Sequence, residues 1–213
     1  MHQEASPTFE LEKPGRIVIA TSNAGKTSEL RELLKPLGVA VLPIGDLANV
    51  DVPDESGSTF AENASIKAAA YAAQIGEWVI ADDSGLEVAA LGGAPGIRSA
   101  RFGGEGSTYY DKMLHLLGEL ELAGNDQREA RFVSVIALAG PDGKVHLTAH
   151  GECRGTIAYE PRGSNGFGYD PIFVPEGCDL TFGEMLDVEK RSHSHRAKAA
   201  DDLIRQMLDF IGL

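Results

Sequence analysis

The stretch RIVIATSNAGKTSEL, residues 16–30, decides the architecture of the chain. Its apolar run over residues 17–20 is typical of a buried strand, and a loop containing Gly25 and Lys26 follows it. The next leucines recur at the spacing of one apolar helix face, at Leu30, Leu33, Leu34 and Leu37. We therefore expect a strand, a glycine-containing loop and a helix that ends near residues 36–38.

The same patterns predict that strands and helices alternate along the rest of the chain. Strands are expected at residues 39–42, 78–81, 131–139 and 145–151, with 156–159 as a candidate extension. Helices are expected at residues 59–73 and 108–120, and a closing helix after Ser194 is expected to carry the apolar positions Ala200, Leu203, Ile204, Met207, Leu208 and Ile211. Thr59 and Glu62 have the spacing of a capping box, Ser194 is a candidate N-cap, and Pro141-Asp142-Gly143 favours a hairpin. Helices that interleave with strands predict an α/β fold with mixed sheet pairing.

Composition and charge exclude several classes of protein. The 213 residues carry 19 Lys and Arg against 32 Asp and Glu, a net charge of −13 that repels nucleic acids and anionic membranes. No apolar run approaches the roughly 18 residues of a membrane span, and the polar, acidic start does not resemble a signal peptide. We expect a cytoplasmic protein with no nucleic-acid or membrane partner. Residues 1–15 are expected to form a flexible extension, residues 16–213 a single domain, and Cys153 and Cys178 reduced, passive thiols.

A candidate phosphate site lies in the loop after the first strand. Residues 20–27, ATSNAGKT, nearly match the pattern G-x-x-x-x-G-K-[ST], with Ala20 in place of the first glycine. Backbone N–H groups at a helix start attract anions, and Lys26 adds a full positive charge there. The alternative is a plain turn with a solvated lysine, because short glycine motifs recur by accident.

Two neighbouring carboxylates, Asp82 and Asp83, stand at the end of the buried strand predicted over residues 78–81. Catalytic groups of α/β sheets commonly lie at such ends, and the long loop over residues 43–58 supplies a further carboxylate, Glu55. Adjacent strand side chains point to opposite faces, so we expect one aspartate to bind Mg²⁺ or activate water and the other to support the loop. The alternative is a turn whose carboxylates only cap backbone amides.

Two later segments are candidates for contact with an anionic, planar ligand. Residues 190–198 hold four basic side chains and no acidic one at the mouth of the closing helix. Residues 161–171 combine three glycines, two prolines and two aromatic residues, so a base could stack on Phe167. The alternatives are a solvated basic patch and an aromatic-anchored turn in the core.

These residues alone leave three functions open. A P-loop ATPase or kinase would use residues 20–27 and the acidic strand, but it leaves Glu55 and the two later segments unexplained. A nucleoside triphosphate pyrophosphatase would use all five clusters, with basic groups on the triphosphate, carboxylates on Mg²⁺ and an aromatic side chain on the base. A nucleotide sensor would use the same groups without turnover.

Six ordered motifs resemble those of the inosine/xanthosine triphosphate pyrophosphatases, a family that removes noncanonical purine nucleotides. The motifs are ATSNAGK (20–26), ESGSTFAENA (55–64) with Lys67, ADDSGLEV (81–88), LGGAPGIRSAR (91–101), GFGYDPIF (166–173) and SHR (194–196) after Lys190. The resemblance covers essentially residues 16–213, and Ser22 and Arg98 depart from the usual family residues.

The resemblance implies an α/β fold with a mixed, twisted central sheet, flanking helices and two lobes around a nucleotide-binding cleft. It also implies a homodimer that hydrolyses ITP, XTP or dITP with Mg²⁺, between the α and β phosphorus, to monophosphate and pyrophosphate. Glu55 and Asp83 would hold the metal, and Asp83 would also accept the proton. The triphosphate side would be lined by Thr21, Ser22, Asn23, Ala24, Gly25, Lys26 and Lys67. The remaining nucleotide-binding residues would be Ser84, Phe167, Gly168, Tyr169, Asp170, Lys190, His195 and Arg196, with Phe167 on the base and His195 and Arg196 near its 6-oxo group.

Overall fold

The computed structural model describes residues 14–47, 50–104, 106–124 and 126–210, and contains a mixed six-stranded sheet in the order β2-β1-β3-β4-β5-β6. The strands are β1 (Arg16–Ile19), β2 (Ala40–Pro43), β3 (Val79–Val88), β4 (Glu129–Ala139), β5 (Val145–Ile157) and β6 (Phe173–Pro175). β1 pairs in parallel with β2 and β3, whereas β3, β4, β5 and β6 pair antiparallel in sequence. The predicted α/β class and mixed pairing are confirmed.

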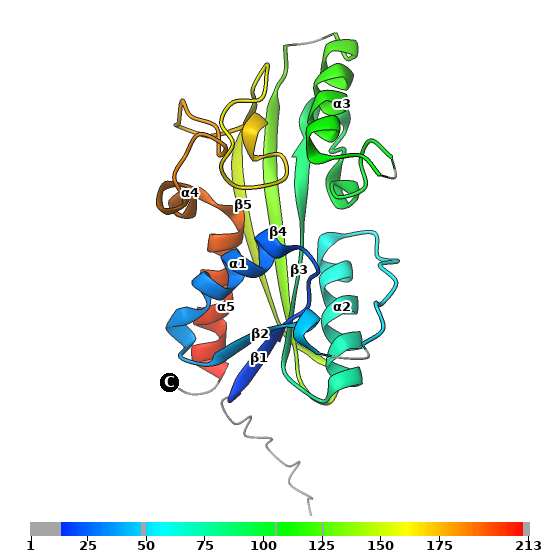
Figure 1. Cartoon of the computed structure of the whole chain (residues 1–213), viewed down its shortest axis with the longest axis vertical. Coiled ribbons are helices and arrows are strands. Elements are labelled where there is room, and N and C mark those ends of the chain that lie inside the picture. Colours follow the sequence, from blue (N-terminus) through cyan, green and yellow to red (C-terminus); the bar gives the residue numbers. More distant parts are fainter. Residues whose placement is uncertain (1–13, 48–49, 105, 125, 211–213) are drawn as a thin grey trace, which may run out of the picture.

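Within these residues, five α-helices flank the sheet (Figure 1). They are α1 (Ala24–Leu33), α2 (Phe60–Ile75), α3 (Tyr109–Leu122), α4 (Asp187–His193) and α5 (His195–Phe210). The Thr59 hydroxyl accepts a hydrogen bond from the backbone N–H of Glu62, and the Ser194 hydroxyl accepts one from that of Arg196. Both residues therefore cap the helices that the sequence patterns assign to them.

The long strands β3, β4 and β5 run through the whole molecule and carry helices on both faces (Figure 1). Val79 and Ala81 of β3 pack with α2 on one face. Ile80, between them, packs with α1 and α5 on the other. Further along the same strand, Leu86 and Val88 pack with α3. This alternation sends Asp82 toward the α1 and α5 face and Asp83 toward the α2 face.

The structure corrects the sequence analysis at three places. β3 does not end before Asp82; it continues to Val88, so both aspartates lie within the strand, opposite Ile136 and Val135 of β4. Acidic residues in an apolar run resemble a strand end in the sequence, but antiparallel pairing with β4 satisfies their backbone groups. β5 similarly continues to Ile157 without a break. The short elements α4 and β6 were not predicted.

Other expectations concern the chain as a whole. Both cysteines are free, and burial raises the pKa of the Cys153 thiol to about 11, which agrees with a passive thiol. In the described part of the chain, no helix is both long and apolar enough to cross a membrane. Residues 1–13, most of the extension expected over residues 1–15, lie outside the described residues.

Candidate active site

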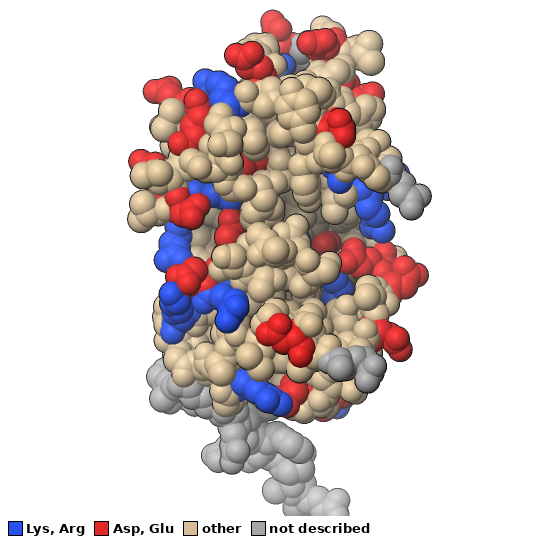
Figure 2. Space-filling view, viewed as in Figure 1, with Lys and Arg blue, Asp and Glu red and all other residues tan. Residues whose placement is uncertain are grey.

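Most of the expected site residues line a single cleft between β3, the α1 start and the segments around Phe167 and Arg196. On the face drawn in Figure 2, acidic and basic side chains lie side by side around the hollowed middle of the molecule. Ala24 and Gly25 do not line this cleft, and Gly25 instead lies against the Phe167 ring. The expected residues that line it are Thr21, Ser22, Asn23, Lys26, Glu55, Lys67, Asp83, Ser84, Phe167, Gly168, Tyr169, Asp170, Lys190, His195 and Arg196.

The segment before α1 is built by local hydrogen bonds. The Asn23 side chain accepts a hydrogen bond from the Lys26 backbone N–H at 3.1 Å, and so caps α1. The Thr21 hydroxyl accepts one from the Asn23 N–H at 3.1 Å. The Lys26 ammonium lies 3.0 Å from a carboxylate oxygen of Asp82, and burial lowers the pKa of Lys26. Lys26 is therefore turned into the protein, which contradicts the alternative of a solvated lysine.

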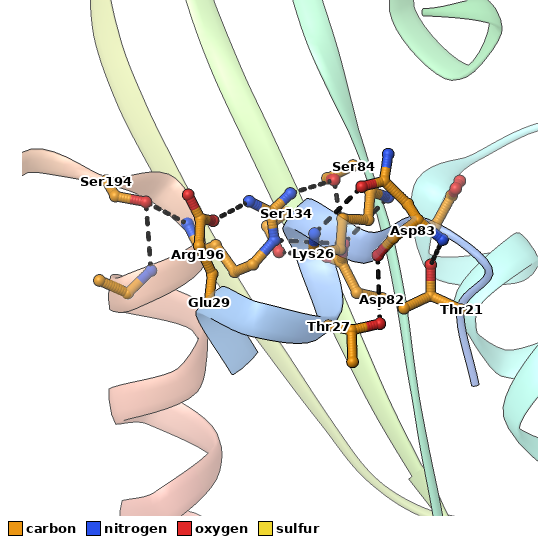
Figure 3. A network of polar contacts seen from close by, with 12 residues as sticks. Thr21, Lys26, Thr27, Glu29, Asp82, Asp83, Ser84, Ser134, Ser194 and Arg196 are labelled. Atoms are coloured by element: carbon orange, nitrogen blue, oxygen red, sulfur yellow. Dashed lines mark hydrogen bonds and ion pairs between the residues drawn. The ribbon is translucent and has the colours of Figure 1, made fainter. Parts of the chain in front are cut away.

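Asp82 is fully buried at the centre of a polar network (Figure 3). Its carboxylate accepts hydrogen bonds from the hydroxyls of Ser134 at 2.6 Å and Ser84 at 3.0 Å. It also pairs with Lys26 and with the Arg196 guanidinium, whose Nε lies 3.4 Å away. Burial alone would raise the pKa of Asp82, but the two cations outweigh it and hold this pKa well below its ordinary value. Asp82 is therefore an ionised anchor.

Asp83 points to the other face of β3 and has fewer partners. One carboxylate oxygen lies 3.2 Å from the Lys67 ammonium, and the other, Oδ2, is buried without a hydrogen-bond partner. Burial raises the pKa of Asp83, although Lys67 and Lys26 oppose the change. The Lys67 ammonium also lies 3.2 Å from Glu55 and donates to the Asp82 backbone carbonyl at 3.1 Å. Asp83, Glu55 and Lys67 therefore form one cluster with one unpaired carboxylate oxygen.

The loop that carries Glu55 is held against the start of α2. The Asn63 side-chain carbonyl accepts a hydrogen bond from the Gly57 N–H at 2.9 Å, and the Glu62 carboxylate accepts one from the Ser58 N–H at 2.7 Å. A Cβ atom at Gly57 would lie 2.6 Å from the Asn63 oxygen, so a larger residue does not fit this position without movement. These contacts place Glu55 next to Lys67, which projects from the same helix.

Two of the four basic side chains in residues 190–198, Lys190 and Arg196, are buried, whereas Arg191 and Lys198 are exposed, so the alternative of a solvated patch is contradicted for the buried pair alone. Lys190 lies 2.7 Å from Glu29 and 2.8 Å from Asp170. Arg196, only 2% exposed, pairs with Glu29 and Asp82 and donates to the Ser84 hydroxyl at 2.8 Å. Burial alone would lower the pKa of Lys190 and of Arg196, but the carboxylates outweigh it and raise both. Both side chains therefore remain charged in the cleft.

Aromatic side chains lie beside these charges. The His195 ring stacks on Phe132 with centroids 4.7 Å apart, and its Nδ1 is buried without a partner. Burial and the neighbouring Arg196 charge hold the pKa of His195 well below its ordinary value, so the ring is neutral near pH 7. The Phe167 ring centroid lies 4.9 Å from the Lys190 ammonium and 5.4 Å from the Arg196 guanidinium carbon. The face of an aromatic ring therefore lies next to polar groups, an arrangement that suits a planar ligand.

Two residues that hold this arrangement, Glu29 and Ser134, were not predicted from the sequence. Glu29 lies three residues after Lys26 on α1 and therefore on the same helix face, a spacing that could have identified it. Ser134 is a buried polar residue in the apolar strand β4, and its hydroxyl contacts Asp82. A polar residue inside an apolar strand is a signal for such a partner.

The carboxylates of Glu55 and Asp83 are the groups in the cleft best placed to hold a cation. In the described residues, no group of three or more His, Cys, Asp or Glu side chains could hold a metal ion. Mg²⁺ commonly takes only one or two carboxylates, with waters and substrate phosphates completing its coordination. The buried, unpartnered Oδ2 of Asp83 fits this type of site.

Comparisons with known proteins identify the family of the chain. The Ham1 family model matches residues 17–206. A dITP/XTP pyrophosphatase of Desulforamulus reducens is 51% identical over 184 residues, covering 86% of this chain and 91% of the relative. A relative with the same name from Deinococcus radiodurans is 47% identical over 189 residues, covering 89% and 91% of the two chains.

Solved structures agree in fold as well. The HAM1 protein of Coxiella burnetii superposes with a TM-score of 0.84 at 42% identity, covering 91% of this chain and 98% of that one. The Ham1 protein of Staphylococcus aureus gives a TM-score of 0.80 at 40% identity, with the same coverage. With its cleft, its motifs and these likenesses taken together, the chain belongs to the Ham1 family.

Proposed function

We propose that the chain is a Mg²⁺-dependent nucleoside triphosphate pyrophosphatase that hydrolyses noncanonical purine nucleotides, ITP, dITP and XTP, to the monophosphate and pyrophosphate. The names of its relatives support the activity and the substrate class. The observation that carries the proposal is the cluster of Asp83, Glu55 and Lys67 in the same cleft as Phe167 and Arg196. Carboxylates for a metal and a proton thus share a cleft with groups for a base.

The base would lie at the Phe167 end of the cleft. Its ring would stack on Phe167, an interaction that does not choose among bases. Discrimination would come from hydrogen bonds of His195 and Arg196 to the 6-position of the base. The 6-oxo group of hypoxanthine or xanthine is an acceptor and suits an N–H donor, whereas the 6-amino group of adenine does not. The unpartnered Nδ1 of the neutral His195 ring and the fully charged Arg196 support this assignment.

The charge balance of the cleft favours a divalent cation as a companion of the substrate. In the described residues, Lys26, Lys67, Arg101, Lys190 and Arg196 are the cations that line the cleft. Their carboxylate neighbours are equally numerous: Glu29, Glu55, Asp82, Asp83 and Asp170. A triphosphate therefore enters a site without a large positive surplus. Mg²⁺ held by Glu55 and Asp83 would supply charge neutralisation and an activated water.

Asp83 is the residue that we assign to proton transfer. Hydrolysis of the α–β anhydride consumes one water, and a carboxylate with an open oxygen can accept the proton that this water loses. The unpaired Oδ2 and the raised pKa of Asp83 both support this role. Lys67 and Lys26, with Thr21, Ser22 and Asn23 at the start of α1, would contact the triphosphate.

Further parts of the proposal extend from the site to the whole protein. Residues 16–213 would form a single pyrophosphatase domain, and the active form would be a cytoplasmic homodimer without nucleic-acid or membrane partners. The family membership gives no support to a P-loop ATPase or kinase. A nucleotide sensor would bind the same ligands but release no product.

Phosphorus NMR of the products from ITP, dITP, XTP, ATP and GTP, with and without Mg²⁺, tests the proposal. We expect IMP and pyrophosphate from ITP, with ATP and GTP largely spared and little turnover without the metal. Orthophosphate with a nucleoside diphosphate would contradict the proposal and favour a P-loop mechanism. Tight binding of ITP without any product would identify a sensor.

A further inference from the structure

Arg101 occupies one end of the cleft. It lines the cleft together with Lys67 and Asp83, and it also lines an adjoining hollow together with Glu55 and Gly57. Phe167 lines the cleft too, but it adjoins a different hollow, between α1 and α4. α1 and α4 lie on the opposite side of the long strands from the loop that carries Glu55 (Figure 1). Arg101 and Phe167 therefore lie toward opposite ends of the cleft.

Arg101 also differs from the other cations of the cleft in its partners. Lys26, Lys67, Lys190 and Arg196 each lie within ion-pair distance of at least one carboxylate. Arg101 forms no side-chain hydrogen bond or ion pair with any residue that the structure describes, and it is exposed. The other four cations are already committed to carboxylates. Arg101 is thus the cation, among the described cleft residues, whose charge is available to a ligand.

The backbone that carries Arg101 is firmly held against β3. The Ser99 hydroxyl accepts a hydrogen bond from the Leu86 N–H at 2.9 Å and donates one to the Gly96 carbonyl at 2.6 Å. The Tyr169 hydroxyl donates to the Ser99 carbonyl at 2.9 Å. A Cβ atom at Gly85 would lie only 2.4 Å from the Gly96 oxygen, so the segment packs directly on the strand that carries Asp83. The backbone near Arg101 is therefore held in place, whereas its guanidinium has no partner among the described residues.

We propose that Arg101 binds the terminal phosphates of the substrate, and hence the pyrophosphate that leaves. This inference rests on the proposed function, which places the base at Phe167 and the reaction at Asp83. A triphosphate that runs from Phe167 past Asp83 brings its β and γ phosphates toward Glu55 and Arg101. A guanidinium presents planar paired donors that match phosphate oxygens, so an unpaired arginine suits this ligand better than a lysine.

The experiment is a calorimetric titration of the full chain, in the presence of Mg²⁺, with inorganic pyrophosphate and separately with IMP. We expect Arg101→Ala to weaken pyrophosphate binding by roughly tenfold or more, because a charged hydrogen bond is lost, and to leave IMP binding unchanged. Arg101→Lys should recover part of the loss, since it restores the charge but not the paired donors. Arg98→Ala is the matched control, because Arg98 lines the adjoining hollow but not the cleft. Its effect on either ligand should stay within about twofold.

Four results would overturn the assignment of Arg101. The first is an Arg101→Ala variant that binds pyrophosphate as tightly as the wild type, and the second is an equal loss of IMP and pyrophosphate binding in that variant. The third is a loss of pyrophosphate binding in Arg98→Ala as large as in Arg101→Ala. The fourth is a wild-type chain that does not bind pyrophosphate. The titration needs no turnover, so it separates this inference from the proposed function. A wild-type chain that releases pyrophosphate from ITP, with an Arg101→Ala variant that binds pyrophosphate normally, would leave the function intact and remove only the role of Arg101.

Discussion

Two neighbouring aspartates on opposite faces of β3 have very different surroundings. Asp82, on the face covered by α1 and α5, is fully buried and receives two hydroxyl hydrogen bonds and two cations. Asp83, on the face covered by α2, meets Lys67 with one oxygen and leaves the other without a partner. The pKa of Asp82 is held well below its ordinary value, whereas burial raises that of Asp83.

This difference shows that partners, rather than residue type, decide what a carboxylate can do. The cations and hydroxyls around Asp82 stabilise its ionised form, so Asp82 is a poor proton acceptor but a strong fixed counter-charge. Asp83 has a higher proton affinity, which suits a general base, and an unpaired oxygen that could contact a metal. The arrangement therefore places a fully partnered carboxylate and a partly unpaired one, which we propose as the proton acceptor, on opposite faces of one strand.

Asp83→Asn is the most direct test of the difference between the two aspartates. The amide keeps the size of the side chain but can neither accept a proton nor balance a metal charge, so we expect kcat/KM for ITP to fall by roughly 10³-fold or more. The melting temperature should change little, because Asp83 has few partners. Steady-state kinetics and a thermal melt measure both quantities. Near-wild-type turnover of this variant would show that the reactive carboxylate is another residue.

Asp82→Asn should act chiefly on stability. It leaves Lys26 and Arg196 buried without this shared counter-charge, and breaking a buried ion pair typically costs about 3–5 kcal/mol. Urea unfolding with a fitted m-value gives the change in unfolding free energy. If the loss stayed below about 1 kcal/mol, the network around Asp82 would not be the anchor that its contacts indicate.

Ser134→Ala tests the same face with a smaller change. It removes the 2.6 Å hydrogen bond from the buried hydroxyl to Asp82 but keeps the ion pairs. A hydrogen bond to a charged group contributes about 1.5–3 kcal/mol, so we expect a loss of unfolding free energy near the lower limit. Ser84→Ala provides the comparison on the cleft side of the same carboxylate. An unchanged urea midpoint for Ser134→Ala would remove this hydroxyl from the anchor.

The smallest expected effect is a difference between the pH dependence of activity and that of folding. The depressed pKa of Asp82 contributes stability that is fully present above its unfolded value and is lost only as pH falls through the folded pKa. Asp83 has a raised pKa and so takes up a proton at a higher pH than an ordinary aspartate. We therefore expect kcat/KM to fall on acidification while the chain is still folded. Parallel pH profiles of kcat/KM and circular dichroism check this, and coincident profiles would contradict the separation of the two carboxylates.

Many local features could be predicted from the sequence because they depend on neighbours in the chain. The strand and helix around residues 16–33, the cap at Thr59 and the cap at Ser194 follow from short-range periodicity and hydrogen bonds. The end of β3 could not be predicted, because Asp82 and Asp83 are accommodated by pairing with β4, some 50 residues later in the chain. The burial of Lys190 and Arg196 could not be predicted for the same reason, because their partners Glu29 and Asp82 lie far away in the sequence.

The α/β class, the candidate chemical segments and the opposite directions of Asp82 and Asp83 could all be predicted from residue spacing. Strand alternation and helix periodicity are local properties of the backbone, so the spacing of apolar residues reveals them. Which aspartate has all its partners, which keeps an unpaired oxygen, and which cation among the described cleft residues has no carboxylate became clear from the folded structure. Those outcomes depend on Lys26, Lys67, Ser134 and Arg196, which distant elements bring to one strand. Burial and charge pairing act through space, and the fold decides which groups meet.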